Sequence, residues 1–173
     1  VPAALAALID DSKKLSARQR EAAFAALMAA QAAGRVEIAL GAASVAEIGR
    51  INILRASLLA MRRALLGLAS PPRSVVVDGN RLPKWRWPAT AIVGGDGCEP
   101  AISAASIIAK VTRDRIMAEL DAAHPGYGWA TNQGYGVAGH ADALNRLGAT
   151  PHHRASFAPV RAVLQRLREE TSR

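Results

Sequence analysis

Two aspartates, each at the end of a short run of β-branched residues, are the clearest candidates for chemistry in this chain. The run SVVVD ends on Asp78 and the run TAIVGGD ends on Asp96, and both acids have glycine beside them. A buried strand that ends on an acid presents its carboxylate at the edge of a sheet, and glycine lets the backbone turn there. Two such acids so close in sequence indicate a shared site for a cation.

Whether the two carboxylates meet depends on how their strands pair. In a hairpin, Asp78 would face the start of the second strand and Asp96 would lie at its far end. In a parallel pair both acids would lie at one edge, but loop 79–89 would have to run back along the sheet, which is short for a parallel crossover. The residues alone leave both pairings open and slightly favour the hairpin.

The elements around these acids predict an α/β domain, because helical patterns alternate with short apolar runs. Ser16 with Gln19, and Ser44 with Glu47, have the spacing of capping boxes at the starts of two helices. The alternation of RVEIALG predicts a further strand over 35–41. Helices are expected over 17–33, 45–69, 100–122, 138–147 and from about 159 onward, and strands over 74–78 and 90–93.

Composition narrows the class of protein. A chain of 173 residues with 50% hydrophobic content is most simply a single domain, residues 1–173. Its formal net charge of +8 favours a polyanionic partner such as nucleic acid, although a basic surface can also serve solubility alone. A single cysteine, Cys98, excludes an internal disulfide and predicts a cytoplasmic setting. No apolar run reaches the ~18 residues of a membrane span.

Several residues have two interpretations. Asn52 lies beside the apolar face of its helix, where a buried asparagine bonded to backbone is favoured over a substrate contact. Trp85 and Trp87 could stack on nucleic acid or be buried under their loop. The run His152, His153 and Arg154 lacks cysteine or carboxylate at zinc-ligand spacing, so a structural or phosphate-contacting role is favoured, and the sequence does not decide between them.

The order and spacing of several motifs resemble those of a known family. The motifs are DSKKLS, EIGRINIL, VVVDGNRLPK, GGDGCEPAISAASIIAKVTRD, HPGYGW, QGYG with a histidine after it, and GATPHHRASFAPV. Together they resemble the ribonuclease HII family, from about Leu8 to Leu164. The ISAASIIAKVTRD block, between the acid-Gly strand and HHR-SF, carries most of the specificity.

The resemblance implies a ribonuclease-H-like fold, a mixed five-stranded sheet flanked by helices in which the strands of Asp78 and Asp96 are parallel. It also implies an endonuclease that hydrolyses the RNA strand of RNA–DNA hybrids and nicks DNA at embedded ribonucleotides. The family site holds two divalent ions, Mn²⁺ or Mg²⁺, on four carboxylates. Asp78 and Asp96 match two of those four and are the expected catalytic metal ligands. We expect a monomer with no membrane partner.

Further family positions concern the substrate. Tyr135 in QGYG matches the tyrosine that packs on a sugar at the RNA–DNA junction. Ser12, Lys13 and Lys14 match a loop that lies against a phosphate backbone. Lys110, on the helix behind the acids, is a plausible partner for phosphate or carboxylate.

Two family features are missing from the sequence. The family opens with strands that carry an adjacent Asp-Glu and a Gly-Arg-Gly-type motif, and this chain contains neither. We therefore expect a domain that is incomplete at its N-terminus, lacks the first strands of the fold, and is poorly stable and nearly inactive by itself. A non-catalytic nucleic-acid-binding remnant of the same fold is the alternative, and a small-molecule enzyme that uses Asp78 and Asp96 is a third possibility.

Overall fold

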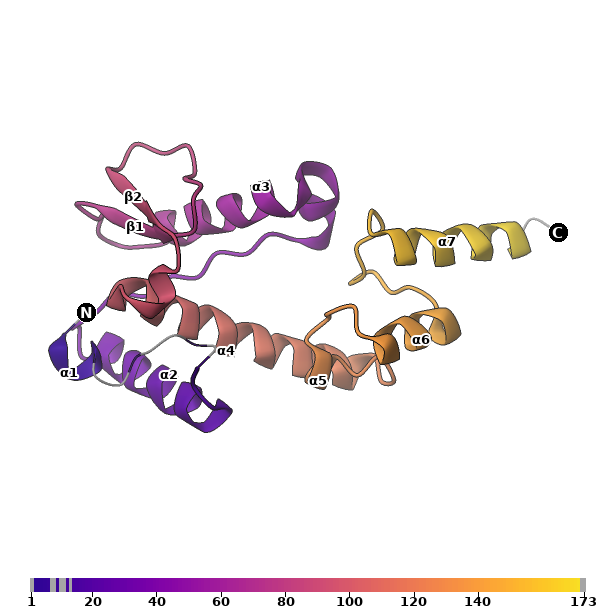
Figure 1. Ribbon diagram of the computed structural model, residues 1–173, viewed down its shortest axis with the longest axis horizontal. Coiled ribbons are helices and arrows are strands. Elements are labelled where there is room, and N and C mark those ends of the chain that lie inside the picture. Colours follow the sequence, from indigo (N-terminus) through magenta and orange to yellow (C-terminus); the bar gives the residue numbers. More distant parts are fainter. Residues whose placement is uncertain (1, 7–8, 10–11, 13, 172–173) are drawn as a thin grey trace. The chain divides into compact units, whose positions relative to one another are not determined.

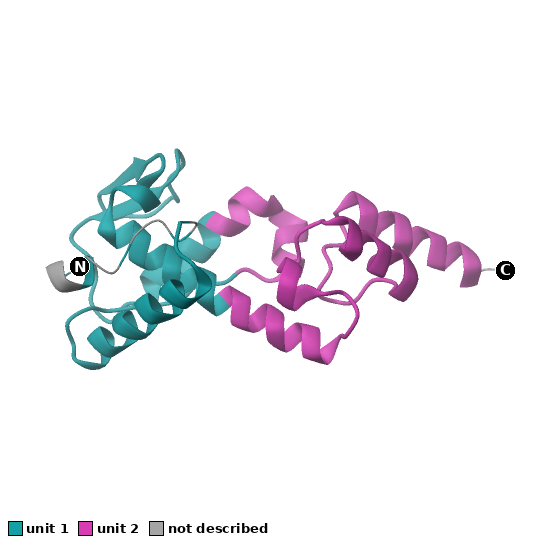
Figure 2. Cartoon of the chain, turned by 60° about the horizontal axis from the view of Figure 1, so that its bottom comes forward, with its two compact units in different colours: residues 1–42, 58–112 teal, residues 43–57, 113–173 magenta. Residues whose placement is uncertain are grey.

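The computed structural model describes residues 2–6, 9, 12 and 14–171. The described chain forms two compact units, shown in Figure 2: unit 1 is Val1–Ala42 with Leu58–Thr112, and unit 2 is Ala43–Ser57 with Arg113–Arg173. The expectation of one domain over 1–173 remains a prediction. In chain order (Figure 1) the elements are α1 (Ala3–Ala6), α2 (Ala17–Ala32), α3 (Val45–Leu66), β1 (Val75–Asp78), β2 (Ala89–Ile92), the 3₁₀ helix η1 (Gly95–Gly97), α4 (Pro100–Ala123), α5 (Trp129–Asn132), α6 (Ala138–Leu147) and α7 (Ala158–Thr171).

The sheet of unit 1 resolves the pairing question. Strands β1 and β2 are parallel, with Val75 opposite Ala89 and Asp78 opposite Ile92. The hairpin that the residues alone slightly favoured is therefore wrong, and the parallel pairing implied by the family resemblance is confirmed. Residues 79–88 make the return without a helix, and both strands end at the same edge of the sheet.

Helix α2 and the first half of α4 supply the core of unit 1. Ser16 caps α2 in a capping box with Gln19, as the sequence predicts. Leu27 of α2 and Ile107 of α4 are the largest fully buried side chains. Their cluster consists of Leu5, Ala23, Leu27, Ala30, Ala104, Ile107, Ile108 and Val111. Residues of α2 and α4 therefore share one buried core in unit 1.

Segment 35–41 is not a strand, contrary to its alternating pattern. Val36 and Ile38 do pack against the core cluster, whereas Leu40 is exposed. Gly41 lies directly against the backbone of α3, where a Cβ would collide with Ala60 and Ala64. Glu37 accepts a hydrogen bond from the backbone N–H of Ala69. The alternation therefore reflects packing on helices, and no neighbouring strand offers this segment a hydrogen-bond ladder among the described residues.

Helix α3 starts at its predicted capping box but is interrupted at Asn52, which has φ 65° and ψ 168°. The side chain of Asn52 is exposed, so the expected burial is wrong. Its Oδ1 accepts a hydrogen bond of 3.1 Å from the backbone N–H of Arg55. The expected backbone bond is thus present, and it caps the helix again after the break, because the short asparagine side chain reaches the N–H three residues on.

Unit 2 is organised around aromatic and aliphatic contacts beyond the middle of α4. Met117, Tyr127, Trp129 and Ala143 form one buried cluster, and Leu144, Val160 and Val163 form a second between α6 and α7. The region 124–137 lies between the expected helices 100–122 and 138–147, and it contains the short helix α5. Helix α6 has its predicted bounds and ends at Gly148, whose φ of +82° favours glycine.

Trp85 and Trp87 contact each other edge to face, with ring centroids 6.2 Å apart, and both are half-buried. The Arg86 guanidinium lies over the Trp87 ring, 5.2 Å from its centroid, a favourable cation–π position.

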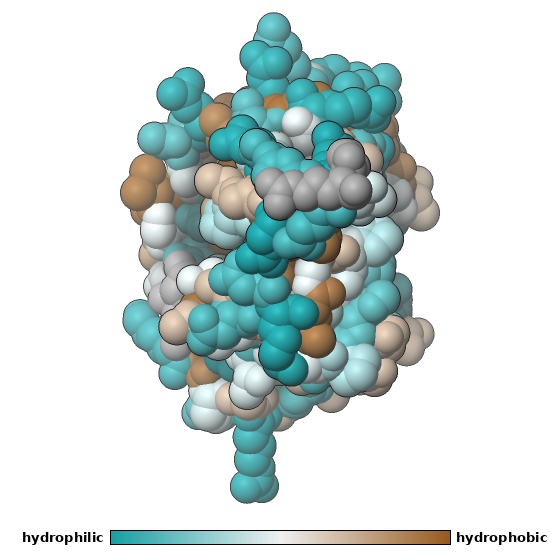
Figure 3. Space-filling model, turned by 90° about the vertical axis from the view of Figure 1, so that its right-hand side faces the viewer, coloured by the Kyte–Doolittle hydropathy of each residue, from teal (hydrophilic) through white to brown (hydrophobic). Residues whose placement is uncertain are grey.

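On the face drawn in Figure 3, hydrophilic side chains predominate and hydrophobic ones show as small areas between them. None of the helices in the described part of the chain combines the length and apolar character needed to cross a bilayer.

Candidate active site and substrate-binding loop

The two predicted acids lie at the same end of the parallel strands in unit 1. Asp78 is the last residue of β1 and is exposed. Its Oδ1 accepts a 3.0 Å hydrogen bond from the backbone N–H of Gly95, the first residue of η1. Asp96 follows directly in η1 and is only 7% exposed. One hydrogen bond therefore fixes the first acid to the turn that carries the second.

The glycines of this turn are needed for its geometry. Gly94 has φ +69°, a left-handed conformation that most other residues adopt only with strain. Gly95 is buried, and a Cβ there would collide with the side chain of Ile102 on α4. At Gly97, by contrast, a Cβ would meet nothing. The GGDG sequence thus contains two glycines with a structural requirement and one without.

Helix α4 fixes the Asp96 backbone through a serine side chain. The hydroxyl of Ser103 donates to the carbonyl of Asp96 at 2.7 Å and to that of Glu99 at 3.1 Å. Ser103 is buried, so its hydroxyl serves these backbone carbonyls. The Asp96 peptide is therefore held by the same helix that closes over Gly95.

The donor chemistry of this edge fits a divalent cation. Carboxylate oxygens are hard ligands of the kind that Mg²⁺ and Mn²⁺ take, and Asp78 keeps an exposed carboxylate. Among the described residues, however, no group of three or more His, Cys, Asp or Glu side chains is placed to hold a metal ion. Among the described residues the site therefore offers two acids, which is half of the four carboxylates that the resemblance implies.

The predicted phosphate-contacting loop has mixed outcomes. Ser12 is buried, and its Oγ lies 2.8 Å from the Oγ of Ser106 on α4, so its hydroxyl packs the loop onto the helix. Lys13 lies outside the described residues. Lys14 is exposed, and Lys110 on α4 is half-buried. The contacts of Ser12, Lys13, Lys14 and Lys110 with substrate remain predictions, and the surroundings of Ser12 favour a supporting role.

Tyr135 stands on a loop of unit 2 whose backbone is held by hydrogen bonds with side chains. The phenol side chain is 66% exposed. Asn132 braces the loop on both sides: its Nδ2 donates to the Tyr127 carbonyl and its Oδ1 accepts from the Gly134 N–H, both at 2.8 Å. Arg113 donates to the Gln133 carbonyl at 2.9 Å. An exposed ring on a braced backbone suits contact with a large ligand.

A cluster of histidines next to this loop was not predicted from the sequence. All four histidines of the chain, His124, His140, His152 and His153, gather around Tyr127 and Trp129. His153 is buried, and this burial, with the neighbouring charge of His140, lowers its pKa to about 4. Of the two roles left open for His153, its burial favours the structural one. His140 belongs to the family motif that follows QGYG, but the sequence assigned it no role because its partners are distant in sequence.

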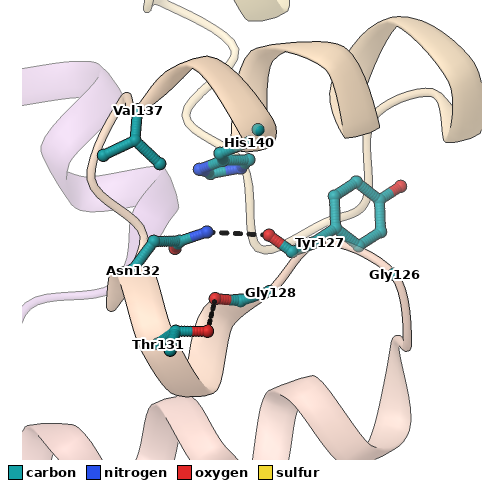
Figure 4. A pocket seen from close by; sticks show the side chains of 8 residues that line it. Gly126, Tyr127, Gly128, Thr131, Asn132, Val137 and His140 are labelled. Carbon is teal, nitrogen blue, oxygen red and sulfur yellow. Dashed lines mark hydrogen bonds between the residues drawn. The ribbon is translucent and has the colours of Figure 1, made fainter.

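Tyr127 and His140 also line a pocket of about 460 Å³ (Figure 4). Gly126, Gly128, Thr131, Asn132, Val137 and Gly139 complete its wall. In Figure 4 the Asn132 side chain reaches across to the Tyr127 carbonyl, and that of Thr131 reaches back to the Gly128 carbonyl. The pocket therefore has a wall of hydrogen-bonded backbone beside the base of the Tyr135 loop.

Comparisons with known proteins agree with the motifs. Residues 4–160 match the family described as ribonuclease HII. The chain is 60% identical to a ribonuclease HII of Rhodospirillum rubrum over 94% of its own length and 73% of that protein, and 57% identical to one of Sphingopyxis alaskensis over 88% and 74%. Its fold is similar to the crystal structure of the ribonuclease H2 from Pyrococcus horikoshii, with a TM-score of 0.71, 26% identity, and coverage of 96% and 85%. The ribonuclease-H-like α/β fold is thereby confirmed, and the chain belongs to the ribonuclease HII family.

Proposed function

We propose that the Asp78–Asp96 edge is the metal-binding part of an endonuclease site. The substrate is the RNA strand of RNA–DNA hybrids, or duplex DNA with embedded ribonucleotides. The observation that carries the proposal is the fixed placement of Asp78 against the Gly95 turn, in a chain that belongs to the ribonuclease HII family.

Hydrolysis of a phosphodiester requires an activated water and stabilisation of the leaving 3′ oxygen. Two divalent ions, Mg²⁺ or Mn²⁺, supply both effects when carboxylates bind them. Asp78 and Asp96 would hold these ions together with the other family carboxylates. In this chain, Asp78 contributes an exposed carboxylate and Asp96 a buried one, while Ser103 and Gly95 keep the two segments in place.

The same proposal includes a low activity for the 173-residue chain by itself. Its sequence contains no Asp-Glu pair and no Gly-Arg-Gly motif, and the described residues hold no cluster of three metal-binding side chains. That last observation also favours a second candidate, a nucleic-acid-binding remnant without catalysis. Both candidates share the substrate surface and differ in whether a cation at the acidic edge produces cleavage.

The charge and the exposed tyrosine support nucleic acid as the partner. A net charge of +8 favours a polyanion through counterion release. The exposed ring of Tyr135 could pack on a deoxyribose, where a 2′-OH would hinder it, so this residue would help to recognise the change from RNA to DNA. Lys14 and Lys110 would add phosphate contacts. A cytoplasmic monomer remains part of the proposal.

One experiment separates these proposals. The purified chain is incubated with a labelled duplex that contains a single ribonucleotide, with Mn²⁺, Mg²⁺ or EDTA, and both binding and cleavage are followed. We expect salt-dependent binding with little cleavage. Rapid cleavage that Asp78→Asn abolishes would support the endonuclease and contradict the low activity. Absence of binding at low salt would contradict the nucleic-acid partner.

A further inference from the structure

His140 connects the loop of Tyr135 to the aromatic core of unit 2 through both of its ring nitrogens. Its Nδ1 lies 3.0 Å from the carbonyl oxygen of Tyr135. Its Nε2 lies 3.3 Å from Nε1 of Trp129 and 3.2 Å from Nε2 of His153. In Figure 4 the ring projects from α6 into the pocket. A side chain of α6 is thus bonded to the backbone of the residue proposed to contact substrate.

Hydrogen-bond chemistry assigns the proton on His140. The Tyr135 carbonyl can only accept, so Nδ1 of His140 must carry its proton. The other nitrogen, Nε2, then accepts in the neutral ring. This agrees with Trp129, whose indole N–H can only donate. The His140 ring is therefore expected in its Nδ1–H form.

His153 has the opposite tautomer for an equally direct reason. Its Nδ1 accepts a 3.0 Å hydrogen bond from the backbone N–H of Thr150, so its proton must be on Nε2. That proton points at the accepting Nε2 of His140. A single directed chain of hydrogen bonds thus runs from the Thr150 backbone through His153 and His140 to the Tyr135 carbonyl.

The chain of hydrogen bonds requires both rings to be neutral. A proton added to His140 Nε2 would face the N–H donors of Trp129 and His153, and one added to His153 Nδ1 would face the Thr150 N–H. The position of His153 opposes such a proton, because Tyr127 and Trp129 rings surround it with centroids 5.0 and 5.2 Å away. The buried aromatic core therefore maintains the tautomer that His140 needs.

We propose that His140 is a positioning residue: its Nδ1–H holds the Tyr135 backbone so that the exposed phenol ring is presented to the nucleic acid. The proposal rests on the substrate role of Tyr135 given above. Asn132 and Arg113 bond the neighbouring Gly134 and Gln133, and the Val137 N–H also bonds the Tyr135 carbonyl. His140 adds the side-chain contact on that carbonyl and links it to the core.

The first test reads the tautomers directly in the full chain. Nitrogen-15 NMR of histidine-labelled protein near neutral pH should show His140 protonated on Nδ1 and His153 protonated on Nε2. This measurement needs no substitution, so it does not depend on whether a variant folds. A His140 ring protonated on Nε2 alone would overturn the hydrogen bond to Tyr135 and with it the proposal.

The second test uses a matched pair of variants. In His140→Asn the amide nitrogen can occupy the place of Nδ1, whereas in His140→Gln it falls near the place of Nε2. Affinity for a fluorescein-labelled duplex with one ribonucleotide, measured in EDTA, should fall about threefold to tenfold for His140→Gln and less than about twofold for His140→Asn. In a Tyr135→Ala background, neither change should weaken binding further.

The outcomes separate the positioning role of His140 from the substrate role of Tyr135 on which it rests. Parent-like binding by His140→Gln, when Tyr135→Ala weakens binding, would overturn the positioning role. An equal loss from His140→Gln with and without Tyr135 would overturn it as well, because the histidine would then act independently. If Tyr135→Ala binds like the parent, the substrate role of Tyr135 fails, and the NMR tautomers still decide whether His140 holds that backbone.

Discussion

The acidic edge of unit 1 and the Tyr135 loop of unit 2 hold the side chains that we propose to be functional in different ways. At the acidic edge, the backbone does the positioning: two parallel strands end together, and the Gly95 N–H binds Asp78 directly. At the Tyr135 loop, side chains do it, through Asn132, Arg113 and His140. The functional group is a carboxylate on a short side chain in one case and an exposed ring in the other.

This difference determines what each region tolerates. A site built by backbone geometry depends on the residues that permit that geometry, here glycines with little side-chain chemistry of their own. A site built by side-chain hydrogen bonds depends on the protonation and identity of polar residues in the core. The two regions should therefore respond differently to added volume, to pH and to loss of single hydrogen bonds.

The largest effect should follow from removal of a carboxylate charge at the acidic edge. Asp78→Asn and Asp96→Asn each lose a hard anionic ligand, so we expect Mn²⁺ affinity to fall by about a hundredfold or more, beyond the effect of losing an outer-shell contact. Isothermal titration calorimetry measures it. Asp142→Asn, an exposed site on α6 of unit 2, is the matched control and should bind Mn²⁺ like the parent. Equal affinities in all four proteins would contradict the assigned ligands.

Added volume in the Gly94–Gly97 turn should distinguish its glycines. Gly95→Ala pushes a methyl group into Ile102, and we expect a loss of about 1–3 kcal/mol in the free energy of unfolding. Gly97→Ala enters open space and should stay within about 0.5 kcal/mol of the parent. Denaturant unfolding of both proteins checks this. A tolerated Gly95→Ala would mean that the turn is not fixed by the packing described above.

The Tyr135 loop should respond to acid through His153. Its pKa is 6.5 in the unfolded chain and about 4 in the folded one, so between these values the unfolded state binds the extra proton. Stability is therefore full above pH 6.5 and declines as the pH falls toward 4, with no further loss from this group below that. The titratable side chains around it are His124, His140, His152 and Tyr127.

Melting temperature measured across this range tests the assignment. His153→Gln should flatten the decline, because the group that titrates is gone, although it also lowers stability at neutral pH. His152→Gln, at the exposed neighbouring position, is the control and should retain most of the slope. An unchanged slope in His153→Gln would place the acid sensitivity elsewhere.

The smallest effect should come from the Asn132 brace. Asn132→Ala removes a donor to the Tyr127 carbonyl and an acceptor for the Gly134 N–H, with an expected cost of about 1–2 kcal/mol confined to the loop. Hydrogen exchange at Gly134 and Tyr135 should accelerate while the amides of β1 stay protected. Asn145→Ala, at an exposed position of α6, should leave both unchanged. Faster exchange in β1 would show that the two regions are not independent.

The sequence predicted the acidic edge better than the loop for a physical reason. The strand-acid-glycine pattern around Asp78 and Asp96 is local, because the backbone that positions each acid lies within a few residues of it. Even so, the residues alone favoured the wrong strand pairing, since direction depends on the path of loop 79–89. The alternation over 35–41 led to a wrong prediction of a strand, because a segment that packs on helices can show the same alternating pattern as a strand.

The support of the loop is non-local. His140 meets Trp129 and His153 only after α5, α6 and the turn before α7 have folded together, so no spacing in the sequence reveals the network. The exposure of Asn52 could not be predicted from the sequence either. It depends on a break in α3, and the apolar spacing continues through that break without a sign of it. Local patterns thus indicate which residues can react, and tertiary contacts decide which residues orient them.

The hydrogen bond from Gly95 to Asp78 has an entropic consequence. A carboxylate on an exposed strand end would ordinarily sample several rotamers, and a cation that binds it must select one of them at a cost in free energy. Here the backbone N–H has already made that selection. Asp78 is preorganised, so a cation that bound to the proposed site would not have to order this carboxylate at a cost in affinity.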